Sequence, residues 1–231
     1  MFGERQLILT CEHGGNEVPA AYADLFHGRD ALLATHRGYD IGALELARRL
    51  AAELDAPLAA ATVTRLLVDL NRSPHNRRGL FSELTRPLPA AEQAKILIRH
   101  YYPYREAVTR QVQALLDSGR GVVHLAVHSF TPVLRGQVRN ADIGLLYDPA
   151  RSLEADFCRA WAERLHRLAP TLRVRRNYPY RGASDALVTG LRRRLPAAFY
   201  LGLELEVNQA LALGGGPVWK DLSRLLATSL R

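Results

Sequence analysis

The strongest constraint on the fold is the alternation of short, apolar, β-rich runs with longer amphipathic segments along the chain. The helical period is clearest over Tyr39–Leu54, where Ile41, Leu44, Leu46 and Leu50 recur at a spacing that puts apolar side chains on one helix face. Alternation of this kind favours a parallel or mixed sheet with helices on both sides. We therefore expect an α/β fold arranged as a three-layer α/β/α sandwich.

The predicted elements follow from these patterns. Strands are expected over Gln6–Cys11, Ala60–Val68, Gly121–Val127, Ile143–Tyr147, Leu172–Arg175 and Phe199–Val207. Helices are expected over Tyr39–Leu54, Ala90–Ser118, Leu153–Leu168, Asp185–Arg194 and Trp219–Leu230. No repeat, low-complexity tract or long linker divides the chain, so we expect one domain over residues 1–231.

The charge of the chain bears on its partners. A net charge of +8 invites a nucleic-acid interpretation, but the arginines are dispersed. The densest cluster, residues 192–194, is flanked by leucines and has no interleaved aromatic residue, which is typical of a solvated helix face. We expect a small anionic substrate rather than a nucleic acid.

Cysteine content and hydropathy bear on location. The two cysteines, Cys11 and Cys158, form no disulfide framework, which suits a reducing compartment. The apolar run Leu7–Leu9 is too short for a signal peptide or a membrane span. We expect a cytoplasmic protein with no membrane association, in which Cys11 is a packing residue.

Polar residues gather where the predicted strands end. His13 follows the first strand, and His128 follows the third. Thr64, Arg65 and residues 69–72 (DLNR) surround the end of the second, and Glu204 and Glu206 lie on the last. Ligands of α/β sheets bind beyond the carboxyl ends of the strands. These side chains are therefore expected to meet at one edge of the sheet.

Two histidines after buried strands suggest a metal site. A lone histidine is more often structural, but His13 and His128 with one carboxylate would supply three ligands and leave a position for water, as catalytic zinc requires. The candidate carboxylates are Glu12, Glu17, Asp40 and Asp69. The pattern does not choose among them, and Asp40 is equally suited to cap the following helix.

The two late glutamates alternate with apolar residues, so Glu204 and Glu206 point to the same face of their strand. Burying two carboxylates is costly, so at least one is expected to face a polar pocket. A general base beside an activated water fits that position, and a salt-bridged structural glutamate is the alternative.

Two arginines are candidates for binding a substrate carboxylate in a bidentate manner, namely Arg72 and Arg181. For Arg72 the ordinary alternative is a pair with Asp69 that steadies the loop. Of the other histidines, His124 lies inside an apolar strand and is expected to be a hydrogen-bonded core residue. His36 is close enough to Asp40 in the sequence to be a reserve ligand.

Taken in order, these segments resemble the N-formylglutamate amidohydrolase family, which is related to zinc-dependent exopeptidases and muramoyl-alanine amidases. The matching segments are CEHGGNEVP (11–19), DIGA (40–43), VDLNRSP (68–74), VHSF (127–130), NYPY (177–180) and LEVNQ (205–209). Each segment alone is weak, but the ordered set covers nearly the whole chain. Asn208 stands where the family usually has an arginine, and residues 192–193 stand where many relatives have a histidine.

The resemblance implies a phosphorylase/hydrolase-like α/β/α fold and a zinc ion held by His13, Asp40 and His128. It makes Glu206 the catalytic base, with Glu204 as the fallback. Arg72 would stabilise developing negative charge on the substrate or bind its carboxylate. Asn16, Asn71 and Ser129, which lie in the matching segments, complete the expected substrate-binding set with Arg72 and Arg181.

The expected function is zinc-dependent hydrolysis of the amide bond of a small N-acyl amino acid, with N-formyl-L-glutamate as the default. One alternative is a peptidase or muramoyl-amide hydrolase with the same zinc centre, although the lack of an export signal speaks against work on the cell wall. The other is a binding protein on the same fold that has no catalytic activity. The oligomeric state is left open.

Overall fold

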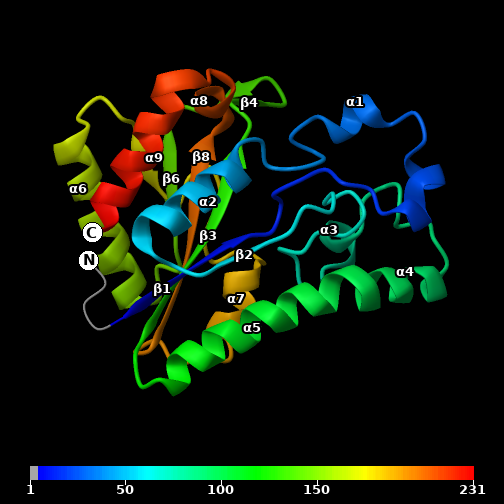
Figure 1. Ribbon diagram of the computed structural model, residues 1–231, viewed down its shortest axis with the longest axis horizontal. Helices are drawn as coiled ribbons and strands as arrows, with labels where there is room; N and C mark the ends of the chain where they lie inside the picture. Colours follow the sequence, from blue (N-terminus) through cyan, green and yellow to red (C-terminus); the bar gives the residue numbers. More distant parts are fainter. Residues whose placement is uncertain (1–4) are drawn as a thin grey trace.

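The computed structural model describes residues 5–231, with the backbone alone for residues 216–218. Its centre is a six-stranded mixed sheet in the order β2-β1-β3-β8-β6-β7 (Figure 1). The strands are β1 (Gln6–Cys11), β2 (Leu58–Ala60), β3 (Val122–Phe130), β6 (Ile143–Leu146), β7 (Val174–Arg176) and β8 (Tyr200–Asn208). The first four in spatial order are parallel, whereas β6 runs antiparallel to β8 and β7 runs parallel to β6.

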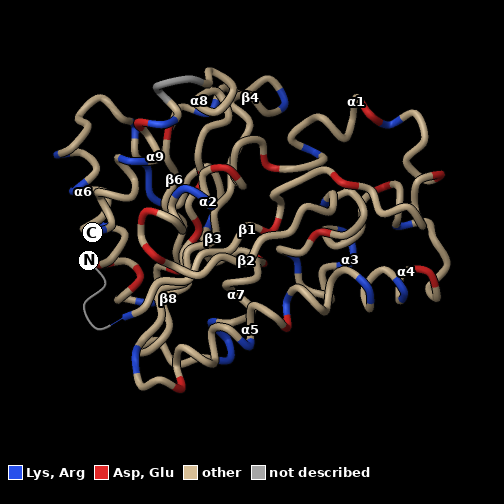
Figure 2. The backbone as a smooth tube through the Cα atoms, in the orientation of Figure 1, with Lys and Arg blue, Asp and Glu red and all other residues tan. Residues whose placement is uncertain are grey.

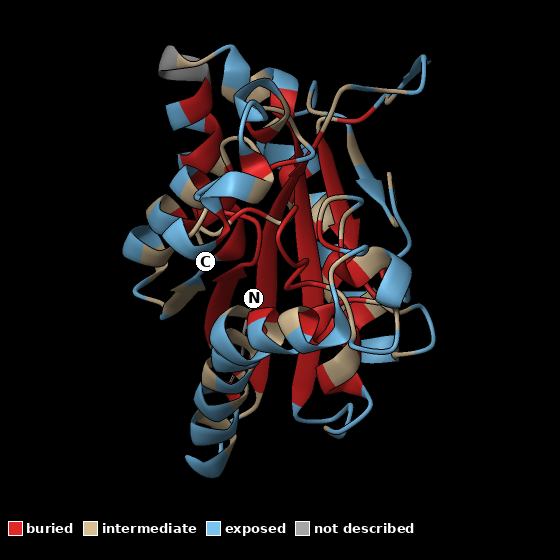
Figure 3. Ribbon diagram, turned by 90° about the vertical axis from the view of Figure 1, so that its right-hand side faces the viewer, coloured by how far each residue is buried: buried red, intermediate tan, exposed pale blue. Residues whose placement is uncertain are grey.

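Helices cover both faces of this sheet (Figure 3). On one face lie α2 (Ala43–Leu54), α6 (Ser152–Leu168) and α9 (Gly216–Leu230), which enclose the main core with the sheet. On the other face lie α5 (Tyr102–Asp117) and α7 (Leu187–Arg192), which pack on Ile8, Val122 and Tyr200. The predicted three-layer fold with a largely parallel sheet is confirmed.

Strand alternation separates an apolar face from a polar one. Alternate residues of β3 and β8 point into the main core, among them Val123, Leu125, Leu203 and Leu205. The intervening residues point to the face covered by α5 and α7. The parallel register pairs Ala126 with Glu204 and His128 with Glu206, so the polar side chains of two strands lie in adjacent rows.

The predicted strand Ala60–Val68 is wrong for most of its length, because β2 ends at Ala60. The apolar residues 66–68 instead bury themselves in a second cluster with Tyr22, Phe26 and Ile96. This cluster is built from the chain between β1 and α2 and from the segment before α5. Packing in this cluster places residues 64–73 across the carboxyl end of β1.

Several helix limits differ from the prediction. The first long helix begins at Ala43 rather than Tyr39, so Asp40 lies before its N-terminus and Gly42 is the capping residue. The helix predicted over Ala90–Ser118 consists of α4 (Ala90–Ile96), a π-helical turn η2 (Leu97–Tyr101) and α5. No helix in residues 5–231 has the length and hydropathy needed to cross a bilayer.

Short elements complete the described chain. They are η1 (Ala20–Phe26), α1 (Asp30–Leu33), α3 (Arg77–Leu80), α8 (Gln209–Leu213) and a hairpin of β4 (Val133–Leu134) and β5 (Gln137–Val138). Asn208, the departure from the family motif, caps α8 by accepting a hydrogen bond from the Ala210 amide. Lys and Arg positions are spread over the outer helices and interspersed with Asp and Glu (Figure 2).

Candidate metal centre and active site

A cavity of about 270 Å³ opens on the polar face, at the carboxyl ends of β1, β3 and β8. Its walls come from these strands, from the segment between β2 and α3, and from the loop between β7 and α7. The lining residues are His13, Asp40, Arg65, Asn71, Arg72, His128, Ser129, Leu146, Tyr180, Arg181, Ser184, Asp185, Ala186, Glu204 and Glu206.

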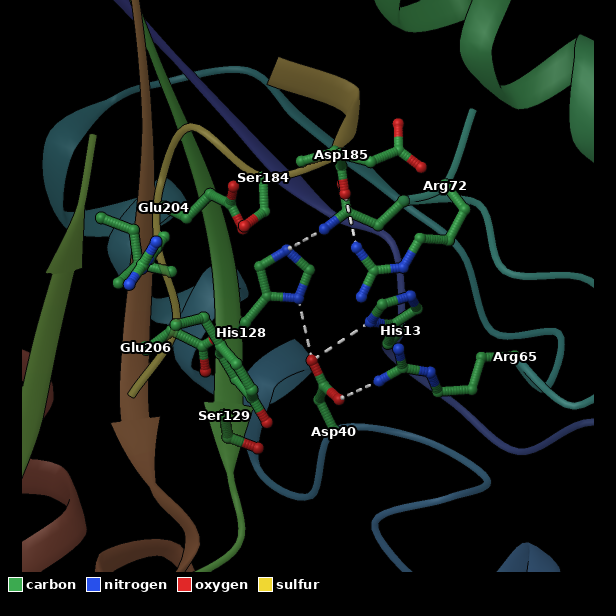
Figure 4. A pocket seen from close by; sticks show the side chains of 15 residues that line it. His13, Asp40, Arg65, Arg72, His128, Ser129, Ser184, Asp185, Glu204 and Glu206 are labelled. Carbon is green, nitrogen blue, oxygen red and sulfur yellow. Dashed lines mark hydrogen bonds and ion pairs between the residues drawn. The ribbon is translucent and has the colours of Figure 1, made fainter. Parts of the chain in front are cut away.

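His13, Asp40 and His128 converge at the centre of this cavity (Figure 4). The Asp40 Oδ2 atom lies 2.8 Å from His128 Nδ1 and 3.3 Å from His13 Nδ1. All three residues are buried, and their potential ligand atoms lie within 4.8 Å of one another. Among the described residues, this group meets the geometric requirements of a metal-binding site.

The outward-facing nitrogen of each histidine meets a second carboxylate. His13 Nε2 lies 2.7 Å from Asp69 Oδ1, and His128 Nε2 lies 3.2 Å from Glu12 Oε2. Carboxylates that accept a proton from the far nitrogen fix the tautomer and orientation of metal-binding histidines. In this site, Asp69 and Glu12 would leave the Nδ1 lone pairs of His13 and His128 directed toward Asp40. The donor set of two imidazole nitrogens and one carboxylate oxygen therefore fits a zinc ion.

The pKa values of Asp40 and His128 are strongly shifted by their neighbours. Burial alone would raise the pKa of Asp40, but the charge on His13 and the hydrogen bond from His128 hold it far below its ordinary value. Burial alone would lower the pKa of His128, but Asp40 and Glu12 raise it well above its ordinary value. A cation that binds here therefore displaces a proton from His128.

Glu204 and Glu206 lie together on one side of the histidines (Figure 4). Both are buried, and the Glu206 Oε2 atom has no hydrogen-bond partner within the described part of the chain. Burial first, then the charges of Asp40 and Glu204, raise the pKa of Glu206 to about 8, against the opposing effect of His128. The predicted common face of the two glutamates is confirmed, and Glu206 is left free to exchange a proton.

Arg65, which was expected at the end of the second strand without an assigned role, borders the centre. Its guanidinium donates to Asp40 Oδ1 at 3.2 Å and to Asp69 Oδ2 at 2.7 Å. The expected pair between Asp69 and Arg72 does not form, because Arg65, four residues before Asp69, occupies that carboxylate. Residues 65–69 lie in turns and irregular backbone, so this spacing is not a helical one and the contact has no local sequence signal.

Arg72 and Arg181 both line the cavity, as the substrate-binding hypothesis requires. Arg72 donates one hydrogen bond to the carbonyl of Asp185 and retains unused donors. The side chain of Arg181 is exposed and has no hydrogen bond or ion pair to another described residue, whereas its carbonyl accepts from the Ser184 amide. Two guanidinium groups thus face the cavity with free hydrogen-bonding capacity.

The other expected substrate-binding residues differ in placement. Asn71 lines the cavity, but its amide oxygen accepts from the Leu187 amide and its nitrogen faces His128 at 3.4 Å. Ser129 also lines it and donates its hydroxyl proton to the carbonyl of Ile41. Asn16 is not among the lining residues and donates to the carbonyl of Leu33, so it is not brought to the site.

The remaining histidines have separate surroundings. His124 bridges Thr10 and the hydroxyl of Tyr200, each at 2.8 Å, as expected of a hydrogen-bonded core residue. His36 is half-buried and does not belong to the three-residue group. Cys11 is fully buried in the main core, and burial, followed by the charges of Glu12 and Asp40, raises the pKa of its thiol.

The fold and the cavity define a class of α/β proteins with a candidate metal centre and a buried acid at the carboxyl edge of the sheet. The chain belongs to the N-formylglutamate amidohydrolase family, whose model matches residues 5–213. Membership indicates a hydrolase that acts on amide bonds and takes a small-molecule substrate.

Two solved structures are similar over nearly the whole chain. Gene product Atu2144 from Agrobacterium tumefaciens is 28% identical, with a TM-score of 0.81 over 98% of this chain and 91% of that one. N-formylglutamate amidohydrolase from Ralstonia eutropha JMP134 is 22% identical, with a TM-score of 0.72 over 97% and 92%, and it supports the fold. No curated protein matches the chain.

Proposed function

We propose that the protein is a zinc-dependent amidohydrolase that removes the acyl group from a small N-acyl amino acid, with N-formyl-L-glutamate as the first candidate. One observation carries the proposal. Two histidines, each with a carboxylate beside its far nitrogen, converge with Asp40 next to the unpaired Oε2 atom of Glu206. Family membership indicates that the bond to be hydrolysed is an amide bond.

The proposed ligands are His13, Asp40 and His128. A zinc ion held there would polarise the amide carbonyl and lower the pKa of a nearby water. Glu206 accepts the proton of the attacking water and delivers it to the leaving nitrogen, which leaves the free amino acid and the released acid as products. The unpaired oxygen of Glu206 suits this role, because no described hydrogen bond has to break before the proton moves.

Arg72 and Arg181 are proposed to bind the carboxylates of the substrate. Arg72 lies across the cavity from Glu204 and Glu206 (Figure 4), and Arg181 lines the same cavity. Arg65 is unsuited to this role because Asp40 and Asp69 already neutralise it. A small cavity with two cations favours a compact substrate that carries one or two carboxylates.

Metal analysis of the purified protein, paired with hydrolysis assays on N-formyl and N-acetyl amino acids, tests this function. We expect one zinc per chain and the fastest turnover with an N-formyl dicarboxylic amino acid. His128→Ala should lose both metal and activity, whereas the exposed His75→Ala should retain both. Full zinc binding by His128→Ala would refute the ligand set, and a zinc-loaded wild type without turnover would refute the substrate class.

A further inference from the structure

The loop between β7 and α7 forms a wall of the cavity, and the mechanism above uses only Arg181 of this loop. Tyr180, Arg181, Ser184 and Asp185 of this loop line the cavity. Among these residues, Tyr180 is the one aromatic side chain, and its phenol is a hydrogen-bond donor that can reach a bound ligand. The question is whether the loop holds that phenol in a fixed place.

The loop is fastened on both sides of Tyr180. The Asn177 side chain accepts from the amide of Tyr147 at 3.1 Å and from the amide of Gly182 at 3.0 Å. A Cβ atom on Gly182 would lie 2.1 Å from the nitrogen of Tyr147, so the loop backbone packs directly against the chain after β6. Buried Arg192 donates to the carbonyl of Gly182 and is paired with Glu154 at 3.1 Å. The loop is therefore preformed.

Arg139, which follows the β4–β5 hairpin, holds the ring itself. Its guanidinium carbon lies 4.9 Å from the centroid of the Tyr180 ring, and its Nη1 donates to Tyr180 Oη at 3.0 Å. The same guanidinium also lies 5.9 Å from the ring of Phe130, at the end of β3. Since Oη accepts from Arg139, its own proton remains available, and no acceptor for it occurs among the described residues.

Tyr180 lines the same cavity as Asp40 and Glu206 and is 44% exposed. Partial burial and the charges of Glu206 and Asp40 raise the pKa of Tyr180 against the opposing effect of Arg139, which keeps the hydroxyl protonated and able to donate. The carboxylates of the substrate have other partners in Arg72 and Arg181, so Tyr180 is free to serve the amide.

We propose that Tyr180 is a further catalytic residue, which donates its hydroxyl hydrogen bond to the amide carbonyl oxygen as negative charge develops there, and that Arg139 is its positioning residue. This inference rests on the proposed function. A preorganised donor aimed at a developing oxyanion contributes more to the transition state than to substrate binding. The effect should therefore appear in kcat and not in KM.

The first test is Tyr180→Phe, which removes the hydroxyl and keeps the ring under Arg139. We expect kcat to fall about 100-fold, while KM stays within about twofold and zinc content is unchanged. The matched control is Tyr178→Phe in the same loop, because Tyr178 does not line the cavity and its ring packs under Arg175 at 4.3 Å. That control should match the wild type in both constants.

The second test separates positioning from a general structural role. Arg139→Ala should lower kcat about tenfold, and the double variant with Tyr180→Phe should be no slower than Tyr180→Phe alone. Arg139→Lys, which keeps the charge but not the planar fork, should recover part of the loss. Multiplicative losses in the double variant would show that Arg139 acts elsewhere and would overturn its assignment.

The outcomes distinguish this inference from the function on which it rests. An active wild type with an unchanged Tyr180→Phe variant, or one in which KM alone rises, overturns the role of Tyr180 and leaves the amidohydrolase function standing. A wild type that hydrolyses no N-acyl amino acid overturns both. A loss of kcat in Tyr180→Phe, with Tyr178→Phe unaffected, supports both.

Discussion

Asp40 is the residue at which the charges of the site meet. One of its oxygens faces both histidines and the other accepts from Arg65, which also binds Asp69. Two buried carboxylates thus share one guanidinium and two imidazoles, an arrangement that tolerates negative charge in the interior. Among the described residues the Glu206 Oε2 atom has no hydrogen-bond partner. This difference between neighbouring carboxyl groups supports the proposed roles of Asp40 as a ligand and Glu206 as a base.

Glu206→Gln should separate catalysis from stability. We expect hydrolysis to fall about 1,000-fold with zinc content retained, because general-base catalysis is lost. Without metal, the pKa of Glu206 is about 8, against 4.5 in the unfolded chain, so the folded state holds this proton more tightly. Stability of the metal-free protein then falls as pH rises from 4.5 through 8, by up to about 5 kcal/mol.

Glu206→Gln removes the loss of stability that accompanies ionisation of Glu206. The metal-free variant should therefore be more stable than metal-free wild type at pH 8 and similar to it at pH 4.5. Urea unfolding at the two pH values measures the difference. Equal stability of the two proteins at pH 8 would show that Glu206 is not buried in the manner described.

Asp69→Asn should weaken metal binding without removing a ligand. Asp69 holds the far nitrogen of His13 at 2.7 Å, and loss of such a carboxylate costs about 10- to 100-fold in metal affinity. Competition with a zinc chelator measures this change directly. Glu17→Gln is the control, since Glu17 is an exposed carboxylate that binds Thr62. An unchanged zinc affinity in Asp69→Asn would contradict the assignment.

At the scale of elements, β3 and β8 carry much of the site because alternation puts their histidines and glutamates on one face. That face was predictable from the sequence, since Glu204 and Glu206 alternate with leucines in β8. The contacts of Arg65 with Asp40 and Asp69 were not, because residues 66–68 have the apolar character of a strand yet pack in a separate cluster. The sequence pattern predicts that residues 66–68 are buried, but it does not predict in which part of the structure they pack.

His124 should make the sheet sensitive to acid. Burial lowers the pKa of His124 to about 4, against 6.5 in the unfolded chain, so the unfolded state binds the proton first as pH falls. Its contribution to stability is therefore complete above pH 6.5 and decreases toward pH 4, by about 3 kcal/mol. His124→Asn should flatten this part of the pH profile, whereas the exposed His75→Asn should not.

Denaturant unfolding between pH 7.5 and pH 4 provides the comparison. In the Glu206→Gln background, which removes the opposing contribution of Glu206, the parent and His75→Asn should lose stability in parallel over this range. A His124→Asn profile as steep as theirs would show that another group governs the acid sensitivity.

Considered as a whole, the protein builds its site from segments far apart in the sequence. His13, Asp40, His128 and Glu206 come from four regions, and the family resemblance selected them in order where spacing alone left four carboxylates open. The roles of Asp69 and Glu12 behind the histidines depend on the meeting of separate elements. Such contacts have no local sequence signal, so the sequence alone does not rank these carboxylates.

Zinc should stabilise the entire fold, because the ligands come from three separate parts of the chain. At a free concentration 1,000 times Kd, a bound metal adds about 4 kcal/mol. In a domain of 231 residues this raises Tm by about 10 °C. Calorimetry with and without a chelator measures the shift. His128→Ala should abolish it and His75→Ala should keep it, and a wild-type Tm unaffected by zinc would exclude this coupling.

The π-helical turn at Leu97–Tyr101 makes the protein unequally tolerant of two kinds of genetic change. This turn fixes the phase of the helix, and the helix delivers Tyr101 to the carbonyl of Arg72 and Tyr104 to Glu12 behind the site. Ile98 within the turn is 64% exposed, so its replacement by another residue should be nearly neutral. A π turn holds one residue more than an α turn, so deletion of Ile98 would close it to regular α-helix and keep these contacts in phase, whereas a further insertion would turn one part of the helix by about 100° and misplace them. The segment is therefore free to vary in composition and to lose a residue over evolution, but not to gain one.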